Sequence, residues 1–358
     1  MRILNLVAGE KWTGPAAVVL DQTAALIQAG LEAQFGFVRD SPLAERLLPL
    51  GWARPLFEPA PRWPLTFLRD VRRLRETIVR EKFDIVHAHT SHDHYVAAWA
   101  VARTQVSLLR TIHHVRHAGR RGPQRLLFSR TRAFAFANSE IARAFGATGP
   151  IHPPVVDAEK FHPAPKPIPV LRRFGLPEAM FLVGTVGKVA AERGHEEAIT
   201  AVARTPEPIG VVHVGHGEWM SRLKKLAASL KVEDRNFWTG YQEQLLPDLY
   251  RCWNAFLFTS SGSEQGQRAI LEAMASGLPV VALDLPGVRD LITDGKEGFV
   301  VGRVADLSDR LAQLVSSQEL RAEMSAQAVK RALDFTAEKF AKKVVPFYKH
   351  FAAPVGKR

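Results

Sequence analysis

One pattern recurs along this chain and limits its fold: a short apolar run, a glycine or polar turn, and a segment with helical periodicity. Strands that are apolar throughout and alternate with helices belong to parallel sheets covered on both faces. The sequence therefore predicts an α/β protein. The predicted strands are Ile3–Ala8, Asp84–Ala88, Ser107–Ile112, Ala133–Ala137, Phe181–Val186, Val211–Val214, Ala255–Phe258, Pro279–Leu283 and Phe299–Val301. The predicted helices include Ala16–Ala29, Tyr95–Ala102 and His195–Ala203.

A proline-rich segment divides this pattern into two parts. Seven of the twenty residues at 150–169 are proline, which lacks an amide donor and fixes φ, so neither a helix nor a central strand can run there. We expect two Rossmann-like domains, at residues 1–165 and 166–335, because each part has its own series of strands and helices. The tail at 336–358 has apolar residues at helical spacing and is predicted to be a helix.

The net charge of +12 is concentrated in one region. Residues 101–150 hold nine arginines and one acidic residue, so they carry +8 of that total. A basic region this local indicates an anionic partner: nucleic acid, an anionic membrane or an anionic substrate. The single cysteine, Cys252, and the absence of a long apolar run or a signal-peptide core lead us to expect a cytoplasmic protein.

The most informative segment is Ser260–Ala282, which follows the strand Ala255–Phe258. A Ser/Gly turn leads into an apolar, buried helix that ends at Gly277. Two carboxylates, Glu264 and Glu272, would be about 12 Å apart if both were helical. That span suits two groups that hold the ends of an elongated polyol. Alternatively, Glu264 interacts with the dipole at the N-terminus of the helix, and Glu272 belongs to a buried ion pair.

This segment resembles the Glu-x7-Glu motif of retaining glycosyltransferases with the GT-B fold, in the family-4-like group (glycosyltransferase group 1). The continuation Glu-Ala-Met-Ala-Ser-Gly-Leu-Pro-Val-Val-Ala is typical of that group. Further segments resemble its other motifs in the same order: Gly14 after the first strand, Pro154–Phe161, Val186–His195, Val212–Glu218 and Phe237–Tyr241. The resemblance is strong at 181–301 and weaker at 1–150. It implies two Rossmann-like domains that face each other across a cleft, with the C-terminal helix crossing back to the first.

The resemblance also implies roles for individual residues. Glu264 and His113 would be catalytic and lie beside the donor sugar, although His114 is an alternative to His113. Lys188 and Arg193 would meet the diphosphate with positive charge, as their place between a strand and a helix also suggests. No Asp-x-Asp occurs to hold a bridging metal ion, so we expect no metal and no cofactor, only a UDP-, GDP- or ADP-sugar as co-substrate. The implied donor-binding residues are Gly14, Lys188, Arg193, Gly215, Tyr241, Gly266, Gln267, Arg268 and Glu272.

Two other clusters leave different readings open. The histidines in His87–His94 approach a zinc motif of metallo-hydrolases, but Ser91 stands where that motif needs aspartate. The arginines Arg116, Arg120, Arg121 and Arg125, close to Leu126–Phe128, could bind an anionic bilayer or an anionic acceptor, or be simply solvated.

The function that the sequence predicts is transfer of a sugar from a nucleotide-diphosphate sugar, with retention and without a metal. The acceptor would be lipid-linked, a lipopolysaccharide or another cell-envelope glycan. The protein would act in the cytoplasm, either free or at the inner face of the plasma membrane. A sugar-nucleotide epimerase and a metallo-hydrolase are the alternative enzymes. Nucleic-acid binding is a third, non-enzymatic class, but no recognisable nucleic-acid module supports it.

Overall fold

The computed structural model describes residues 1–10, 14–59, 65–114, 124–206, 208–260 and 266–352. These residues form two compact units, Met1–Val155 with Ala337–Arg358, and Val156–Thr336. The boundary lies ten residues earlier than the predicted 165/166. Phe161 packs into the core of the second unit, and the Val156 amide donates to the Phe335 carbonyl at 3.0 Å. The proline-rich segment therefore packs mostly on the second unit.

The first unit holds a six-stranded parallel sheet in the order β3-β2-β1-β4-β5-β6. This is the strand order of a dinucleotide-binding Rossmann fold, in which ligands bind beyond the carboxyl ends of the strands. Its strands are β1 (Arg2–Leu6), β2 (Glu32–Val38), β3 (Ala53–Phe57), β4 (Ile85–Ala88), β5 (Ser107–Ile112) and β6 (Ala133–Phe136). Its helices are α1 (Gly14–Gln28), α2 (Pro42–Leu47), α3 (Leu65–Arg80), α4 (Ser91–Ala100), α5 (Gln124–Ser129), α6 (Ser139–Phe145) and α15 (Ala337–Ala352).

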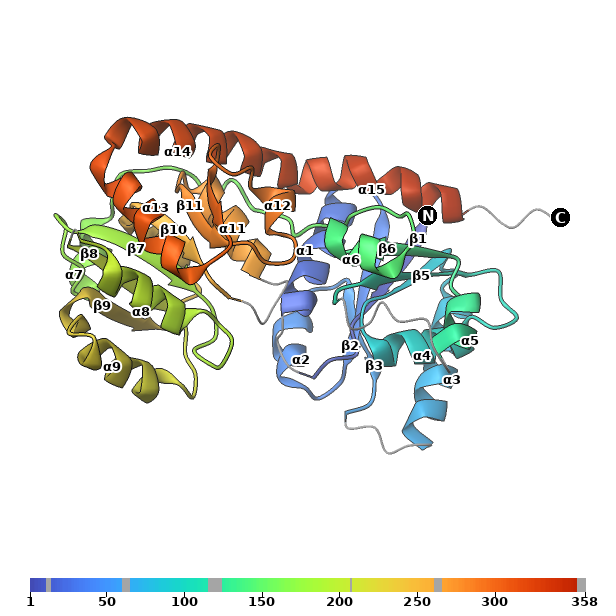
Figure 1. Cartoon of the computed structure of the whole chain (residues 1–358). Helices are drawn as coiled ribbons and strands as arrows, with labels where there is room; N and C mark the ends of the chain where they lie inside the picture. Colours follow the sequence, from blue (N-terminus) through green and yellow to red (C-terminus); the bar gives the residue numbers. More distant parts are fainter. Residues whose placement is uncertain (11–13, 60–64, 115–123, 207, 261–265, 353–358) are drawn as a thin grey trace. The chain divides into compact units, whose positions relative to one another are not determined.

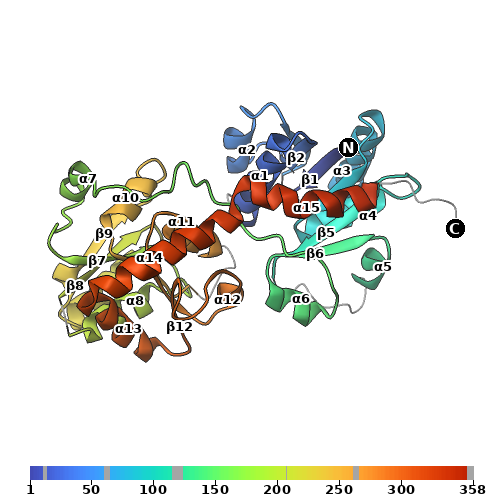
Figure 2. The same cartoon turned by 90° about the horizontal axis from the view of Figure 1, so that it is seen from above.

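Helices cover both faces of this first sheet (Figure 1). On one face, α3 and α4 bury Leu74, Ile78 and Val96 against the strands. On the other face, α1 and α15 bury Leu26 and Val344 against β1 and β4. The C-terminal helix α15 thus packs with the first unit, where it lies along α1 (Figure 2).

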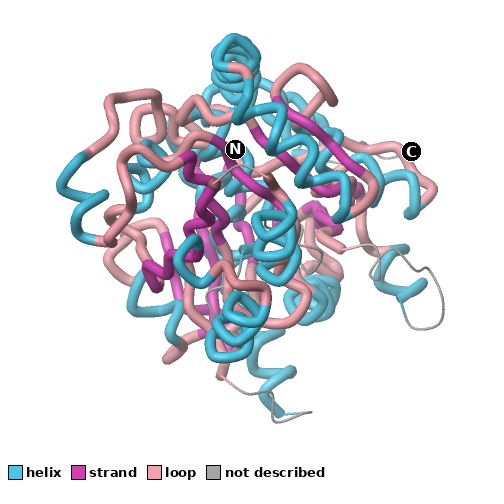
Figure 3. Tube along the Cα trace, turned by 60° about the vertical axis from the view of Figure 1, so that its left-hand side comes forward, coloured by secondary structure: helices cyan, strands magenta, loops and turns pink. Residues whose placement is uncertain are grey.

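The second unit repeats the architecture with the order β12-β11-β10-β7-β8-β9, again parallel throughout. Its strands are β7 (Phe181–Val186), β8 (Ile209–Val214), β9 (Asn236–Gly240), β10 (Ala255–Phe258), β11 (Val280–Leu283) and β12 (Gly298–Val301). Its helices are α7 (Ile168–Arg173), α8 (His195–Arg204), α9 (Met220–Ser229), α10 (Leu246–Cys252), α11 (Gly266–Ala275), α12 (Val288–Leu291), α13 (Val304–Ser316) and α14 (Gln318–Ala332), with 3-10 turns η2 (Glu233–Arg235) and η3 (Leu333–Phe335). Figure 3 shows the strands in magenta and the helices around them in cyan.

Two Rossmann-like units confirm the predicted fold class. Three strands were missing from the prediction: β2, β3 and β9. Strand β2 contains Gly36, where a side chain would meet Leu6 and Leu56 at 2.7 Å. Strand β3 contains Pro55 and lies at the edge of its sheet, where proline is tolerated. Both residues weaken the local strand signal, while the neighbouring strands and helices stabilise the strands.

Candidate active site

Glycines line the carboxyl edge of the second sheet, where loops follow β7 and β8. Gly194, the N-cap of α8, has φ 76°, and a Cβ there would lie 2.3 Å from the Thr259 backbone. Gly215 has φ 151°, and a Cβ there would lie 1.8 Å from the Gly187 carbonyl oxygen. Only glycine allows these close backbone approaches. The loops after β7, β8 and β10 therefore meet around the N-terminus of α8, which is a favourable position for an anion.

The two predicted diphosphate-binding cations lie on the loop between β7 and α8. Lys188 is exposed, and its Nζ lies 3.0 Å from a carboxylate oxygen of Glu218. A hydrogen bond from the Glu218 backbone, and to a smaller extent Lys188, lowers the pKa of the Glu218 carboxyl. Arg193 is half-buried and directly precedes the N-cap Gly194. An anionic ligand at the α8 N-terminus would compete with Glu218 for Lys188.

A pair of buried histidines supports this loop, and sequence reasoning missed it. Nδ1 of His195, the first residue of α8, lies 3.1 Å from Nδ1 of His213 in β8, and its Nε2 lies 3.2 Å from the Lys188 carbonyl oxygen. His213 Nε2 contacts Asn236 Oδ1 at 3.0 Å, and the ring stacks on Trp238. Burial lowers the pKa of His195 to about 4 and that of His213 to about 3. The signal for this pair in the sequence is His213, a polar residue within the otherwise apolar run 209–214.

Glu272 lies in α11 and is 5% exposed. One carboxylate oxygen accepts from Arg268 Nε at 3.0 Å, and the other accepts from the Tyr250 hydroxyl at 3.1 Å. Burial raises the pKa of Glu272, and the Arg268 guanidinium opposes that shift. The structure thus shows the buried ion pair that the sequence allowed, with α10 supplying Tyr250 as a third member.

The other predicted donor residues have varied surroundings. Gln267 is buried, and its Nε2 donates to the Pro286 carbonyl at 3.1 Å, which ties the start of α11 to the loop before α12. Tyr241 follows β9 directly and is 59% exposed. Gly14 begins α1 and Gly266 begins α11. The predicted catalytic residue Glu264 lies outside the described residues.

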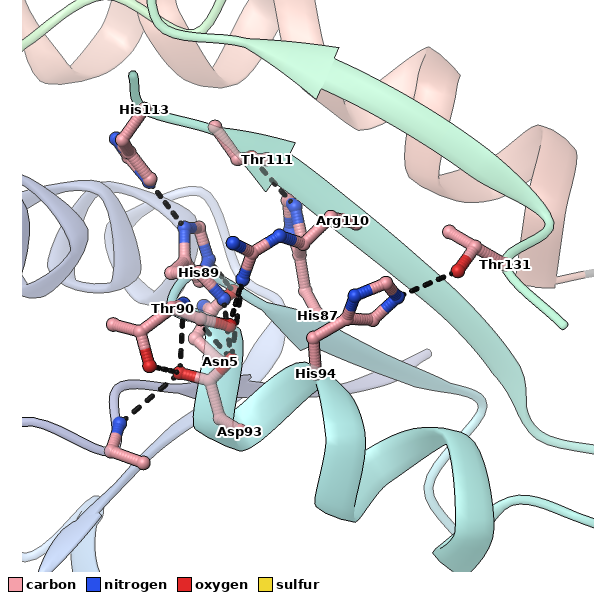
Figure 4. A network of polar contacts seen from close by, with 11 residues as sticks. Asn5, His87, His89, Thr90, Asp93, His94, Arg110, Thr111, His113 and Thr131 are labelled. Atoms are coloured by element: carbon pink, nitrogen blue, oxygen red, sulfur yellow. Dashed lines mark hydrogen bonds and ion pairs between the residues drawn. The ribbon is translucent and has the colours of Figure 1, made fainter. Parts of the chain in front are cut away.

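In the first unit, His113 follows β5 and is held by a chain of hydrogen bonds (Figure 4). The Thr23 hydroxyl donates to the Val19 carbonyl at 2.7 Å and accepts from Asn5 Nδ2 at 2.9 Å. Asn5 therefore presents Oδ1 to His89 Nε2, 3.4 Å away, which makes Nε2 the protonated nitrogen of His89. His89 Nδ1 then accepts from His113 Nε2–H at 3.1 Å. This relay makes Nε2 a protonated ring nitrogen of His113.

Asp93, a fully buried residue of α4, connects the ends of β1 and β4 with a side chain of β5 (Figure 4). Its carboxylate accepts from the amides of Ala8, His89 and Thr90 and from the Thr90 hydroxyl, at 2.7–3.1 Å. The buried guanidinium of Arg110 in β5 lies 3.4 Å away and donates to the Thr90 carbonyl. Burial raises the pKa of Asp93 and Arg110 opposes that shift, whereas burial lowers the pKa of Arg110 to about 10. The sequence places Asp93 only within the zinc-like motif and gives no sign of this network.

The described residues do not support the zinc reading of His87–His94. His87 contacts the Tyr348 hydroxyl and Thr111 Oγ1, both at 2.8 Å. His94 contacts Thr131 Oγ1 at 2.7 Å, and His92 lies 3.6 Å from Asp70. The histidines thus have separate structural partners. Over the described parts of the chain, no group of three His, Cys, Asp or Glu residues could hold a metal ion.

The predicted arginine patch is located only in part. Arg116, Arg120 and Arg121 lie outside the described residues, as does the side chain of Arg125. One of the nine arginines counted at 101–150, Arg110, belongs to the core. The charge that this region offers to a partner is therefore lower than the sequence count suggests.

Two family models match the chain and follow one another along it. Residues 12–146 match the Glycosyltransferase Family 4 model, and residues 171–331 match the Glycosyl transferases group 1 model. Each match covers most of one structural unit. Together they favour sugar transfer over epimerase and metallo-hydrolase chemistry.

Individual proteins agree with the family models. A D-inositol 3-phosphate glycosyltransferase of Frankia alni is 28% identical over 83% of this chain and 81% of its own. The lipopolysaccharide core biosynthesis glycosyltransferase LpsE of Rhizobium meliloti is 31% identical over 40% of this chain and 42% of its own. Other curated relatives also match over about half of their own length, 42–54%. The crystal structure of Anabaena Alr3699/HepE in complex with UDP has a TM-score of 0.84 at 20% identity, and covers 98% of this chain and 100% of that one.

Proposed function

Because the chain belongs to the group 1, family-4-like glycosyltransferases, we propose that it moves a sugar from a nucleotide-diphosphate sugar to a cell-envelope acceptor with retention of anomeric configuration. The acceptor class that we favour is a lipid-linked glycan or lipopolysaccharide. LpsE, a relative named for lipopolysaccharide core biosynthesis, supports this choice. We further propose that no metal ion takes part.

The observation that carries the proposal is the glycine-lined edge of the second sheet with its two cations. A nucleoside diphosphate leaves with concentrated negative charge as the glycosidic bond breaks. Lys188 and Arg193 flank the loop that ends at the N-cap of α8, where backbone amides and the helix dipole favour an anion. The positive charges would stabilise the leaving group as a divalent ion does in other enzymes. The UDP complex of the Anabaena structure is consistent with such a donor.

The carboxylates and His113 are proposed to act on the rest of the donor. Glu264 would bind hydroxyls of the sugar near the reacting carbon, and Glu272 would accept hydrogen bonds from the ribose. For Glu272 this role requires that Arg268 and Tyr250 share the carboxylate, since each oxygen has lone pairs beyond its present hydrogen bond. His113 would lie beside the donor sugar and contact one of its hydroxyls.

A thermal-shift panel of UDP-, GDP- and ADP-sugars tests the proposed function directly. A ligand at 100 times its Kd stabilises the folded state by about 2.7 kcal/mol, which is a readily measured shift. One nucleotide series should stabilise the protein equally with and without EDTA. No shift with any of the three, or a shift that EDTA abolishes, would contradict the proposed donor or the proposed independence of metal.

The first prediction concerns Lys188 and Arg193. Changing both to alanine should weaken binding of the free nucleoside diphosphate by at least about tenfold, or about 1.4 kcal/mol, because the diphosphate loses both cations. Isothermal titration measures this loss. The matched control is Glu218→Gln, which removes the carboxylate that pairs with Lys188 and should leave binding unchanged or stronger. Weaker binding in Glu218→Gln would show that Glu218 assists the ligand.

A second prediction separates the two glutamates of the Glu-x7-Glu motif. Glu264→Ala should lower turnover by at least about tenfold and spare binding of the free nucleoside diphosphate, because Glu264 is proposed to contact only the sugar. Glu272→Gln should weaken nucleoside diphosphate binding, because Glu272 is proposed to contact the ribose. Steady-state kinetics together with titration of UDP or GDP distinguish the two. Full turnover in Glu264→Ala would refute the assignment of the sugar-facing carboxylate.

A further inference from the structure

Exposed large hydrophobic side chains gather on two neighbouring helices of the first unit. Across the described parts of the chain nine such side chains are exposed, and five of them lie on α3 and α4. These five are Leu65, Leu68, Val79, Tyr95 and Trp99, with exposed fractions of 64%, 60%, 57%, 36% and 45%. The two helices lie side by side (Figures 1 and 2), and Arg75 Nη2 of α3 donates to the Trp99 carbonyl at 2.6 Å. We call this surface the α3–α4 face.

Helix α3 is apolar on two sides, but only one side is needed for folding. Phe67, Leu74 and Ile78 are buried against the sheet. Leu65, Leu68 and Val79 recur at the helical spacing of the opposite, exposed side, together with arginines. An apolar side chain exposed at such a site contributes nothing to the core, and a cluster of them indicates an interaction surface.

The charge of the α3–α4 face is positive. Within α3 the exposed side carries Arg69, Arg72, Arg75 and Arg80 and one acidic residue, Glu76, which pairs with Arg72 at 2.7 Å; the helix residues alone thus give a net of three positive charges. The remaining acidic residue of the helix, Asp70, is 1% exposed. The neighbouring Glu81 pairs with Arg54 at 2.5 Å and with Arg80 at 3.2 Å. The acidic residues that balance this helix in the sequence are thus mostly withdrawn from its surface.

The chemistry of this face matches the interfacial zone of an anionic bilayer. Leucine and valine can enter the acyl boundary, Trp and Tyr favour the headgroup level, and arginine keeps its charge among phosphates while its stem lies against lipid. The Arg130 guanidinium stacks 4.6 Å from the Trp99 ring, so the aromatic and a cation are already combined there. Within the described ranges, none of the helices has the length and apolar character of a membrane span.

We propose that the α3–α4 face docks the protein on an anionic lipid surface. The docking itself is independent of the proposed function, whereas its use, to bring the enzyme to a lipid-borne acceptor, rests on that function. The arginines would supply a salt-sensitive attraction and the leucines a salt-resistant insertion. This places the membrane contact on a different element from the arginines at 116–125.

The test is flotation of the full chain with vesicles of neutral phosphatidylcholine and with vesicles that contain 30% anionic phosphatidylglycerol. The wild type should bind the anionic vesicles only, and high salt should weaken that binding. Leu65→Ser/Leu68→Ser and Arg69→Ser/Arg80→Ser should each reduce the fraction bound at least tenfold. The matched controls lie on the second unit: Leu230→Ser/Leu333→Ser removes two exposed leucines, and Lys224→Ser/Lys225→Ser removes two exposed cations of α9. Both controls should bind as the wild type does.

Several results would overturn the proposal. The first is a wild type that does not float with anionic vesicles. The second is unchanged flotation in the α3 variants while Arg120→Ser/Arg121→Ser/Arg125→Ser abolishes it, which would move the contact to that segment. The third is a wild type that forms a dimer and does not bind vesicles. If Leu65→Ser/Leu68→Ser abolished that dimer, the α3–α4 face would be a contact between two copies of the chain. UDP or GDP should bind each α3 variant with the affinity that it has for the wild type, as measured by titration. This control separates a failure of docking from a failure of the proposed donor site.

Discussion

Acidification from pH 7.5 to 5.5 should destabilise the first unit about twice as much as the second. The cause is a set of six buried histidines whose pKa is lowered mainly by burial, which penalises the charged imidazolium. Four belong to the first unit and two to the second. They are His87, His89, His94 and His152, and His195 and His213.

The direction follows from the protons that each state binds. In the unfolded chain these histidines take up protons near pH 6.5, whereas the folded protein keeps them neutral until the pH nears about 3 to 4 for those with a resolved value. The unfolded state therefore binds more protons between about pH 6.5 and 4, and stability falls as the pH falls through that window. Integrated from pH 7.5 to 5.5, each histidine lowers the unfolding free energy by about 1 kcal/mol, so four histidines cost the first unit about twice what two cost the second.

Calorimetry of the full chain at pH 7.5, 6.5 and 5.5 measures the shift of each unit's transition. His152→Leu provides the internal test, because neither ring nitrogen of His152 has a hydrogen-bond partner and the ring packs against Phe340, Phe347 and Tyr348. The leucine variant should be at least as stable at pH 7.5 and less sensitive to acid. His350→Gln, at an exposed site on α15, should follow the wild type. Equal acid sensitivity of the two units would show that these histidines accept protons in the folded state.

The sequence predicted the sheets best where apolar residues run without interruption, as at Phe181–Val186 in β7. It failed at β9, where residues 237–241 suggested a nucleotide-base loop and the structure has a strand through Gly240. The polar start and terminal glycine of that segment give no strand signal. Its pairing with β8 and the stacking of Trp238 on His213 depend on tertiary contacts.

In the candidate site, the positions of loop residues could be predicted from the sequence, whereas the interaction partners of buried polar groups could not. Glycine loops and cations follow strand ends at fixed spacing, so the position of Lys188 and Arg193 between β7 and α8 could be predicted from local sequence. The partners of the buried polar groups could not, because they are remote along the chain. Tyr250 is 22 residues from Glu272, and Ala8 is 85 residues from Asp93. A carboxylate in an apolar helix indicates that a partner exists but does not identify it.

Asp93→Ala is expected to destabilise the first unit by about 3–5 kcal/mol, which is a large part of the stability of a typical domain. The variant removes the acceptor of three backbone amides and one hydroxyl, and it leaves the Arg110 guanidinium, 2% exposed, without its anion. Removing one partner of a buried pair is costly because the other charge stays buried and uncompensated. Asp93→Asn keeps the shape but not the charge, so a smaller loss is expected.

Urea unfolding of the full chain, followed through the transition of the first unit, measures this loss. The matched control is Asp284→Ala, since the Asp284–Arg289 pair is bidentate but exposed and should cost less than about 1 kcal/mol. Asp93→Ala combined with Arg110→Met should lose less than the sum of the two single variants, by about 1–3 kcal/mol, because the double variant leaves no buried unpaired charge. Additive losses would mean that Asp93 and Arg110 act independently. In that case the amides of Ala8, His89 and Thr90, rather than the ion pair, would account for the stability that Asp93 provides.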